Sequence, residues 1–174
     1  MVHYAAIALG HLGKDSAVPH LAKLLDHTQQ SVRCAAAQGL ASIGTYKVVS
    51  YLGRMLQDSD WVTRLTAAKG LGDVGSRTCL PHLIRALGDS EWSVRLHAAL
   101  SLGRIGVRKD AVPALHATLR DPKSNVRRGV CQALSLLGDE SSEEALRATL
   151  RDSDDKVAQA ARDAIAVIRH ETEE

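Results

Sequence analysis

The sequence contains no phenylalanine, and aromatic residues make up only 3% of its 174 residues. A globular core of this size normally uses aromatic side chains, so their scarcity favours thin helices that pack closely through small and aliphatic residues. No apolar stretch approaches the roughly 18 residues of a membrane span. No basic segment precedes an apolar one at the start, as it would in a secretory leader. We therefore expect neither a membrane protein nor a secreted one.

The sequence also lacks closely spaced cysteine pairs and a large excess of positive or negative residues. Cys34, Cys79 and Cys131 are an odd number without C-x-x-C spacing, which favours reduced thiols in a cytoplasmic protein. Lys and Arg number 22 against 20 Asp and Glu, a balance that does not by itself indicate nucleic-acid binding. The sequence also lacks a nucleophile elbow, a P-loop, a dinucleotide fingerprint and a zinc-ligand spacing. We expect no enzyme, no cofactor and no metal ion.

An internal repeat is the strongest positive feature of the sequence. The glycines that end similar segments recur every 31 residues, with the last one residue late: Gly13, Gly44, Gly75, Gly106 and Gly138. The extra residue is expected in a loop near Val107, because insertions in loops cost little free energy. Charged residues recur in the same register, namely Arg33, Arg64, Arg95 and Arg127 with Asp58, Asp89, Asp121 and Asp152. A period of this length is typical of solenoids.

Each repeat is predicted to contain a short first helix and a longer second helix. The first helices are expected at 17–25, 48–57, 79–88, 111–120 and 143–151, and the second helices at 1–12, 30–43, 61–74, 92–105, 124–137 and 155–169. A glycine after the second helix suits a left-handed cap. In four repeats a capping residue precedes a proline or glutamate by three positions: Ser16 with Pro19, Thr78 with Pro81, Asp110 with Pro113 and Ser141 with Glu144.

The segments AVPHLAKLLD and SVRCAAAQGLASIG resemble HEAT repeats, specifically the short HEAT-like variety also found in phycobilin lyases. The resemblance covers essentially the whole chain and implies an all-α fold, a right-handed α-solenoid of stacked two-helix repeats. One array would fill 1–174, with an incomplete repeat at 1–13, helical pairs at 14–44, 45–75, 76–106, 107–138 and 139–170, and an acidic tail at 171–174. The resemblance also implies that the recurring Asp and Arg residues form a structural ladder between repeats, which His27 and Ala158 interrupt.

A step of 100° per residue predicts which second-helix side chains line a concave groove. If Val32 points at its first helix, positions equivalent to Gln30, Cys34 and Gln38 lie opposite the core. The two tryptophans of the chain occupy one such position in adjacent repeats. Apolar patches with polar rims are typical of interfaces, and tryptophan is enriched among binding anchors. The predicted partner-binding residues are Trp61, Leu65, Lys69, Trp92, Leu96, His97, Leu100, Arg128 and Gln132.

These residues favour a non-catalytic scaffold that binds a protein or peptide partner, for example an amphipathic helix laid across the second helices. One alternative is that both tryptophans lie over the loops and pack against a neighbouring repeat. A second is a nucleic-acid interface like that of HEAT-type DNA glycosylases. It would use Trp61, Trp92, Asp73, Lys69, Arg104 and Arg128. The groove has few positive charges and ends in Asp155 and Asp163, which disfavours phosphate binding. A bilin lyase-like enzyme subunit is a third alternative, although no residue set here marks bilin transfer.

Histidine does not indicate a metal centre either. Deoxyhypusine hydroxylase, a HEAT-repeat enzyme, holds two irons through several His-Glu pairs, and this sequence has one such pair, His170-Glu171. His20 and His82 lie two repeats apart, too far to share an ion at about 10 Å per repeat. Both are expected to be solvated surface imidazoles.

The two ends of the array are predicted to differ. The helix at 1–12 lacks a first-helix partner, so Ala5, Leu9 and Leu12 would lose half of their cover. We expect either further repeats before it or a homodimer through this edge. At the other end, Arg162 and Arg169 replace a small residue and the glycine, and they are expected to cap the stack.

Overall fold

A computed structural model describes residues 2–173 of the chain, with side chains from residue 2 to residue 170. Every regular element in that part is an α-helix or a short 3-10 turn, and the helices recur in pairs. The predicted α-solenoid is therefore confirmed. The helices form two compact units, Met1–His82 and Leu83–Glu174, whose boundary lies inside α6 (Leu80–Ala86). None of the helices in the described part is long and apolar enough to cross a membrane.

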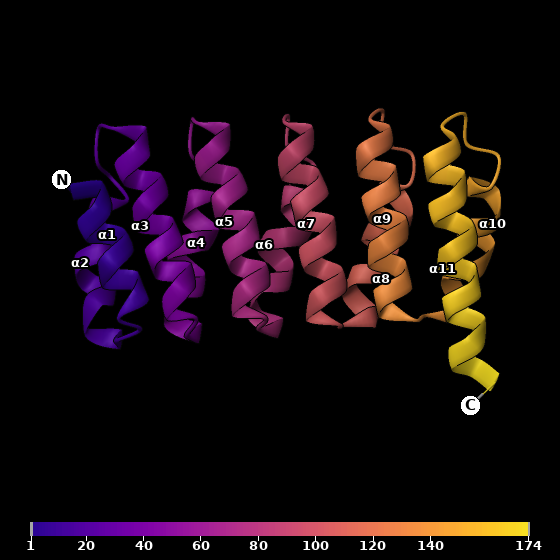
Figure 1. The fold of residues 1–174 in the computed structure, drawn as a ribbon, viewed down its shortest axis with the longest axis horizontal. Helices are drawn as coiled ribbons and strands as arrows, with labels where there is room; N and C mark the ends of the chain where they lie inside the picture. Colours follow the sequence, from indigo (N-terminus) through magenta and orange to yellow (C-terminus); the bar gives the residue numbers. More distant parts are fainter. Residues whose placement is uncertain (1, 174) are drawn as a thin grey trace. The chain divides into compact units, whose positions relative to one another are not determined.

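Unit 1 places its longer helices in one row and its shorter helices in another (Figure 1). The long row contains α1 (Val2–His11), α3 (Gln30–Ile43) and α5 (Trp61–Val74). The short helices α2 (Val18–Leu24) and α4 (Val49–Met55) lie behind them, and each follows a 3-10 turn, η1 (Asp15–Ala17) and η2 (Tyr46–Val48). The turn η3 (Arg77–Cys79) leads into α6. In this arrangement α3 packs against α1, α2, α4 and α5.

Unit 2 repeats the same two rows. Its longer helices are α7 (Trp92–Ile105), α9 (Ser124–Leu137) and α11 (Asp155–Glu173). Its other helices are α8 (Arg108–Thr118), the turn η4 (Glu140–Ser142) and α10 (Glu143–Thr149). The helix α9 contacts α7 and α11 on its two sides and α8 behind it.

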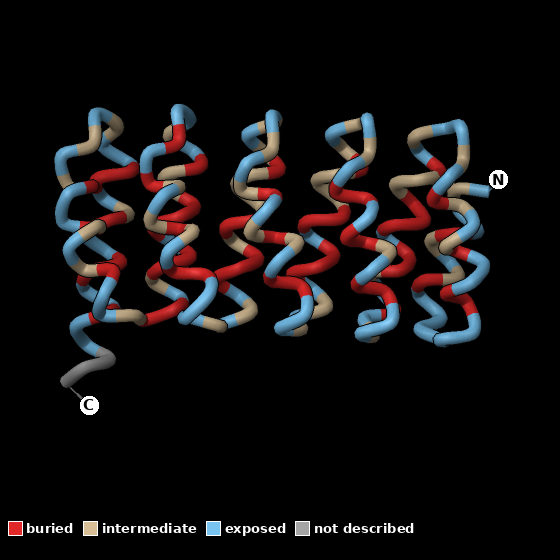
Figure 2. The backbone as a smooth tube through the Cα atoms, turned by 180° about the vertical axis from the view of Figure 1, so that it is seen from behind, coloured by how far each residue is buried: buried red, intermediate tan, exposed pale blue. Residues whose placement is uncertain are grey.

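The core of each unit is aliphatic. Buried and exposed positions alternate along the helices (Figure 2), as expected when each helix covers a neighbour with one face only. Fully buried leucines occur in both rows: Leu21, Leu40, Leu52 and Leu71 in unit 1, and Leu102, Leu115, Leu134 and Leu146 in unit 2. The scarcity of aromatic residues is thus accommodated by helices thin enough for leucine and alanine to fill the space between them.

The second helices lie where the sequence predicted them. The ranges 30–43, 61–74, 92–105 and 124–137 agree with α3, α5, α7 and α9, whereas α11 continues to residue 173. The glycines that follow these four helices adopt φ values of 57–76°, the left-handed region that favours glycine. These glycines end the helices and begin the turn to the next repeat.

The predicted starts of the first helices are wrong in detail. In four repeats a 3-10 turn precedes the α-helix, so Ser16, Thr78 and Ser141 lie inside turns and do not cap a helix. The side chains that accept turn N–H groups come two residues earlier, from Ser76 and Asp139. Sequence spacing alone did not separate a helix cap from a turn cap, because both use the same residue types.

The extra residue near Val107 is accommodated in a helix and not, as predicted, in a loop. Elsewhere the turn closes with an i to i+3 hydrogen bond, as from Cys79 N–H to Ser76 O at 2.9 Å. In α8, Ala111 N–H bonds to Val107 O, four residues back, at 3.4 Å. The added residue therefore changes a 3-10 turn into a turn of α-helix and does not lengthen a loop. Pro113 consequently lies inside α8 instead of in its first turn.

Candidate functional site

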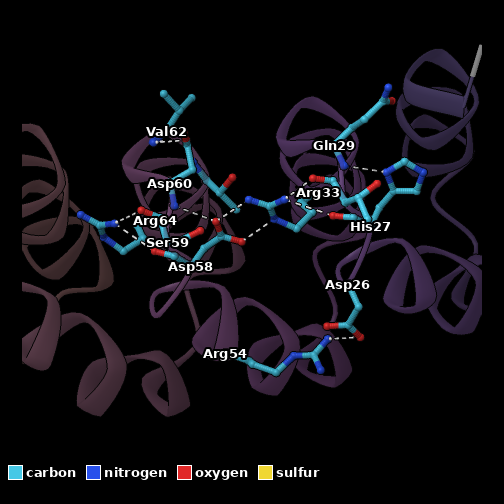
Figure 3. A network of polar contacts seen from close by, with 12 residues as sticks. Asp26, His27, Gln29, Arg33, Arg54, Asp58, Ser59, Asp60, Val62 and Arg64 are labelled. Carbon is cyan, nitrogen blue, oxygen red and sulfur yellow. Dashed lines mark hydrogen bonds and ion pairs between the residues drawn. The ribbon is translucent and has the colours of Figure 1, made fainter.

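Charge-assisted hydrogen bonds connect consecutive second helices in unit 1 (Figure 3). Arg33 of α3 donates from Nε and Nη2 to the two carboxylate oxygens of Asp58, at 2.8 and 2.9 Å. Through Nη1 it also donates to the carbonyl oxygens of His27 and Thr28, at 3.1 and 3.2 Å. Asp58 in turn accepts the backbone N–H of Asp60 at 2.9 Å. One arginine thus ties the turn before α3 to the turn before α5.

His27 partly replaces the aspartate that the other repeats have at its position. Its Nδ1 accepts the N–H of Gln29 at 3.0 Å, the bond that a carboxylate oxygen makes in the later turns. The imidazole therefore preserves the turn before α3.

The same arrangement occurs twice in unit 2. Arg95 of α7 donates to Asp121 at 2.6 and 2.9 Å, and Arg127 of α9 donates to Asp152 at 2.7 Å on both oxygens. Two further members of the predicted ladder, Arg64 and Asp89, also make hydrogen bonds in their own turns. Arg64 donates to the carbonyls of Asp58 and Ser59, and Asp89 accepts the N–H of Glu91.

These ion pairs are largely shielded from water. The arginine side chains of the three pairs are 11–15% exposed and the aspartates 5–10%. Hydrogen bonds from Arg33 and Arg127 lower the pKa values of Asp58 and Asp152 from 3.8. Burial raises the pKa of Asp121, but hydrogen bonds from Arg95 and the Lys123 N–H outweigh it, so this pKa is also lowered. The carboxylates are ionised near neutral pH and hold the second helices in place.

In unit 2 part of the predicted binding surface forms a continuous face. Trp92, Leu96 and Leu100 follow one another at four-residue intervals on α7, which places them on one side of the helix. The Trp92 side chain is 36% exposed. Leu96 lies directly over α9, where a Cβ on Gly129 would collide with its Cδ1. The structure thus brings α7 and α9 together closely enough for leucines of α7 to cover the glycine of α9.

A cavity of about 410 Å³ adjoins this face in unit 2. Leu100 and Gln132, two of the predicted residues, line it together with Leu136 and Asp163. Leu136 is 61% exposed, whereas the other leucines of α9, Leu134 and Leu137, are buried. Alanines of α11 complete the lining, so the cavity has an apolar floor and a carboxylate at its edge.

The other predicted residues are not part of the lining of this cavity. On α9, Arg128 is half-buried and Gln132 is exposed; His97 of α7 is half-buried. In unit 1, Trp61, Leu65 and Lys69 follow one face of α5 at four-residue intervals, and Trp61 is 46% exposed. Both indoles therefore reach solvent, as a binding role requires. Their joint use as one partner-binding surface stays a prediction.

Sequence reasoning missed Leu136. Its register position holds Ser42, Asp73 and Arg104 in the earlier repeats, so a leucine at a position that is otherwise polar was the available signal. The small residues Ala160 and Ala164 were also missed, because only the packing of α9 on α11 shows that they leave a hollow.

The histidines and cysteines are placed as structural residues. His20 is exposed, as predicted, but His82 is half-buried against Gly53 of α4, where an added Cβ would lie 2.5 Å from its ring. Burial raises the pKa of Cys131 to about 12 and raises that of Cys79, so both remain thiols at neutral pH. The side chain of Glu171, in the one His-Glu pair, and the acidic tail at 171–174 lie outside the described side chains.

The model of the HEAT repeats family matches residues 3–64, 52–110 and 80–166 of the chain. No curated protein matches the sequence. Among solved structures, the complex of CpcE and CpcF of phycocyanin lyase from Nostoc sp. PCC7120 is similar, with 24% identity and a TM-score of 0.75 over 89% of this chain and 66% of that chain. This chain thus spans just under two thirds of the length of that relative.

Two further structures resemble the chain over most of its length. Human deoxyhypusine hydroxylase is 19% identical, with a TM-score of 0.55 over 97% of this chain and 79% of that chain. A designed armadillo repeat protein in complex with the peptide (KR)4 is 15% identical, with a TM-score of 0.66 over 95% and 91%. At these identities the similarity concerns the fold alone.

Proposed function

Because the chain belongs to the HEAT-repeat family, we propose that it is a non-catalytic scaffold that binds a peptide segment of a protein partner on its second helices. The observation that supports this most directly is the cavity beside α7, since it is lined by Leu100, Gln132 and the exposed Leu136. Small apolar cavities with a few polar groups are typical places for an anchor side chain.

The chemistry of the cavity defines the segment that it fits. Leu100, Leu136 and the alanines of α11 offer an apolar floor to an aliphatic or aromatic anchor. Asp163 at the edge is exposed and suits a Lys or Arg next to that anchor in the partner. Trp92 lies eight residues before Leu100 on the same face of α7 and provides a second apolar contact. The designed armadillo neighbour, whose complex contains a basic peptide, supports a peptide-binding mode for this type of fold.

The proposal is tested by selecting peptides from a displayed library on the intact chain and measuring their affinities for variants. Leu136→Glu places a charge in the cavity and is expected to weaken the selected peptides about tenfold or more, a loss of about 1.4 kcal/mol. Trp92→Ala should weaken them too, and melting is measured beside the affinities, because a residue that is only 36% exposed also contributes to packing. The selected peptides should share an apolar residue beside a basic one.

Leu12→Glu is the matched control, since Leu12 in unit 1 is 64% exposed against 61% for Leu136. It should leave the affinities unchanged. Equal losses from both variants, or peptides that ignore Leu136 and Trp92 altogether, would refute the proposed site.

A further inference from the structure

A second cavity lies in the row of shorter helices of unit 2 and is lined by residues of and just after α8 and α10. Its volume is about 580 Å³, larger than that of the cavity on the second helices. Its apolar wall includes Ala117 of α8 and Ala145 and Ala148 of α10, and two arginines, Arg120 and Arg151, line it as well. Neither the ladder nor the proposed peptide site uses these residues.

The repeat register shows why this cleft is open. Ala117 and Ala148 occupy the position that holds Lys23, Arg54 and Arg85 in the earlier repeats. Ala145 occupies the position of His20, Tyr51 and His82. Long side chains are therefore replaced by methyl groups at three places in two consecutive repeats. In unit 1, by contrast, the His82 ring fills the space beside Gly53.

The same two repeats have an additional arginine each at the edge of the cleft. Arg120 and Arg151 stand at the position of Asp26, Gln57 and Gly88. Both are exposed, and neither makes a side-chain hydrogen bond or ion pair with another residue of the described part. Of the surface arginines of α10 and α11, Arg147 and Arg169 pair with Glu143, and Arg162 donates to the side-chain oxygen of Gln159.

The remaining polar groups of the cleft leave this positive charge in place. The carboxylate of Asp152 is held by Arg127 through both oxygens at 2.7 Å, so its charge is compensated. The Nε2 of His116 lies 3.0 Å from the hydroxyl of Ser142. Two guanidinium groups are thus left beside an apolar wall, without an anionic partner.

We propose that the cleft between α8 and α10 is a binding site for an acidic peptide segment, with an aliphatic side chain against the three alanines and carboxylates on Arg120 and Arg151. Guanidinium groups recognise carboxylates through two parallel hydrogen bonds. Each arginine lies two residues beyond the end of its helix, α8 or α10, and the axes of adjacent helices are about 10 Å apart in such packing. Acidic residues three positions apart in a polyproline II segment, which has three residues per turn and rises about 3.1 Å per residue, lie on one side and span roughly that distance. A single small carboxylate meets only one arginine, and two cations are too few for phosphate-driven nucleic-acid binding.

The test uses a fluorescein-labelled six-residue peptide with Glu at its second and fifth positions and Leu between them, titrated onto the intact chain and followed by anisotropy. The same peptide with Gln in place of Glu is the isosteric control. We expect the acidic peptide to bind at least tenfold more tightly than the Gln peptide at low salt. Arg120→Gln and Arg151→Gln should each weaken it about fivefold to tenfold.

Two further variants separate the cleft from net charge and from folding. Arg85→Gln removes the same charge from an exposed arginine of α6 that does not line the cleft, and it should leave the affinity unchanged. Ala148→Leu fills the cleft at an exposed position without altering charge, and it should abolish the preference for the acidic peptide while melting stays unchanged.

Three results would overturn the proposal. They are equal binding of the acidic and Gln peptides, an equal loss from Arg85→Gln, and competition by free glutarate as strong as that by the peptide, which would indicate a site for small anions. If a short DNA duplex bound more tightly than the acidic peptide, and Arg120→Gln and Arg151→Gln removed that binding, the cleft would be assigned to nucleic acid. Leu136→Glu should not affect this peptide, so failure here is distinguishable from failure of the site on the second helices.

Discussion

At the scale of single residues, Asp121 shows how one side chain joins several turns. Its carboxylate accepts two hydrogen bonds from Arg95 and one from the N–H of Lys123, and its carbonyl oxygen accepts one from Arg127. The residue is only 8% exposed, so these bonds are made away from water. Loss of the carboxylate would leave a guanidinium group that is 11% exposed without its counter-charge.

We therefore predict that Asp121→Ala lowers the free energy of unfolding by about 3 kcal/mol, the lower end of the range for breaking a buried ion pair. Asp139→Ala is the control, because the carboxylate of Asp139 bonds only to Ser141 of its own turn among the hydrogen bonds described. Its loss should cost about 1 kcal/mol. Urea unfolding followed by circular dichroism measures both, and equal losses would contradict the role assigned to the pair.

At the scale of elements, close approach between second helices depends on small residues. A Cβ added to Gly103 of α7 would lie 2.7 Å from the Cα and 3.0 Å from the carbonyl oxygen of Ala133 in α9. Backbone atoms cannot move aside as a flexible side chain can. The glycine therefore sets the distance between the two helices that form the face with Leu96 and Leu100.

Gly103→Ala should accordingly destabilise the protein by about 1–3 kcal/mol, the usual cost of overpacking, although alanine favours a helix by about 1 kcal/mol over glycine. Gly88→Ala is the matched control, since its nearest neighbour is Arg85 O at 3.6 Å and its backbone is not left-handed. Its effect should stay within about 0.5 kcal/mol. Thermal unfolding of both variants checks the difference, and a neutral Gly103→Ala would show that α7 and α9 can separate freely.

At the scale of the whole molecule, stability is distributed over repeated contacts. Each second helix packs against its neighbours in the row and against its own first helix, as α9 does against α7, α11 and α8. Solenoids are accordingly stabilised by the sum of similar interfaces. The ion pairs of Arg33 with Asp58, Arg95 with Asp121 and Arg127 with Asp152 repeat one electrostatic contribution, so protonation of these aspartates affects the chain in several places at once.

The pH dependence of unfolding follows from the lowered pKa values of Asp58, Asp121 and Asp152. Their contribution is fully present above about pH 4, near the ordinary value of 3.8, and is lost as pH falls through the lower folded values. In that window the unfolded chain binds more protons, so stability rises with pH. We expect the free energy of unfolding to decline steeply below pH 4. Asp152→Asn should make this decline less steep, which urea titrations at pH 3, 4 and 5 would measure. If the pair did not contribute, the free energies of the variant and of the unchanged protein would decline in parallel.

Much of this fold was already determined by the sequence. The 31-residue period, the helical pattern and the glycines after each second helix located α3, α5, α7 and α9 to the residue, because these signals are local and repeat in register. The positions equivalent to Gln38 were also expected to face away from the core, and Gln132 and Lys69 are exposed.

Only the tertiary structure decided the rest. The 3-10 turns and the helical turn that absorbs the extra residue of α8 depend on backbone hydrogen bonds that residue types do not specify. The two cavities depend on the distance between neighbouring helices, α9 and α11 for one and α8 and α10 for the other. Periodicity fixes the direction of a side chain from its own helix, but the depth of a hollow is set by the neighbouring helix, which the local pattern does not contain.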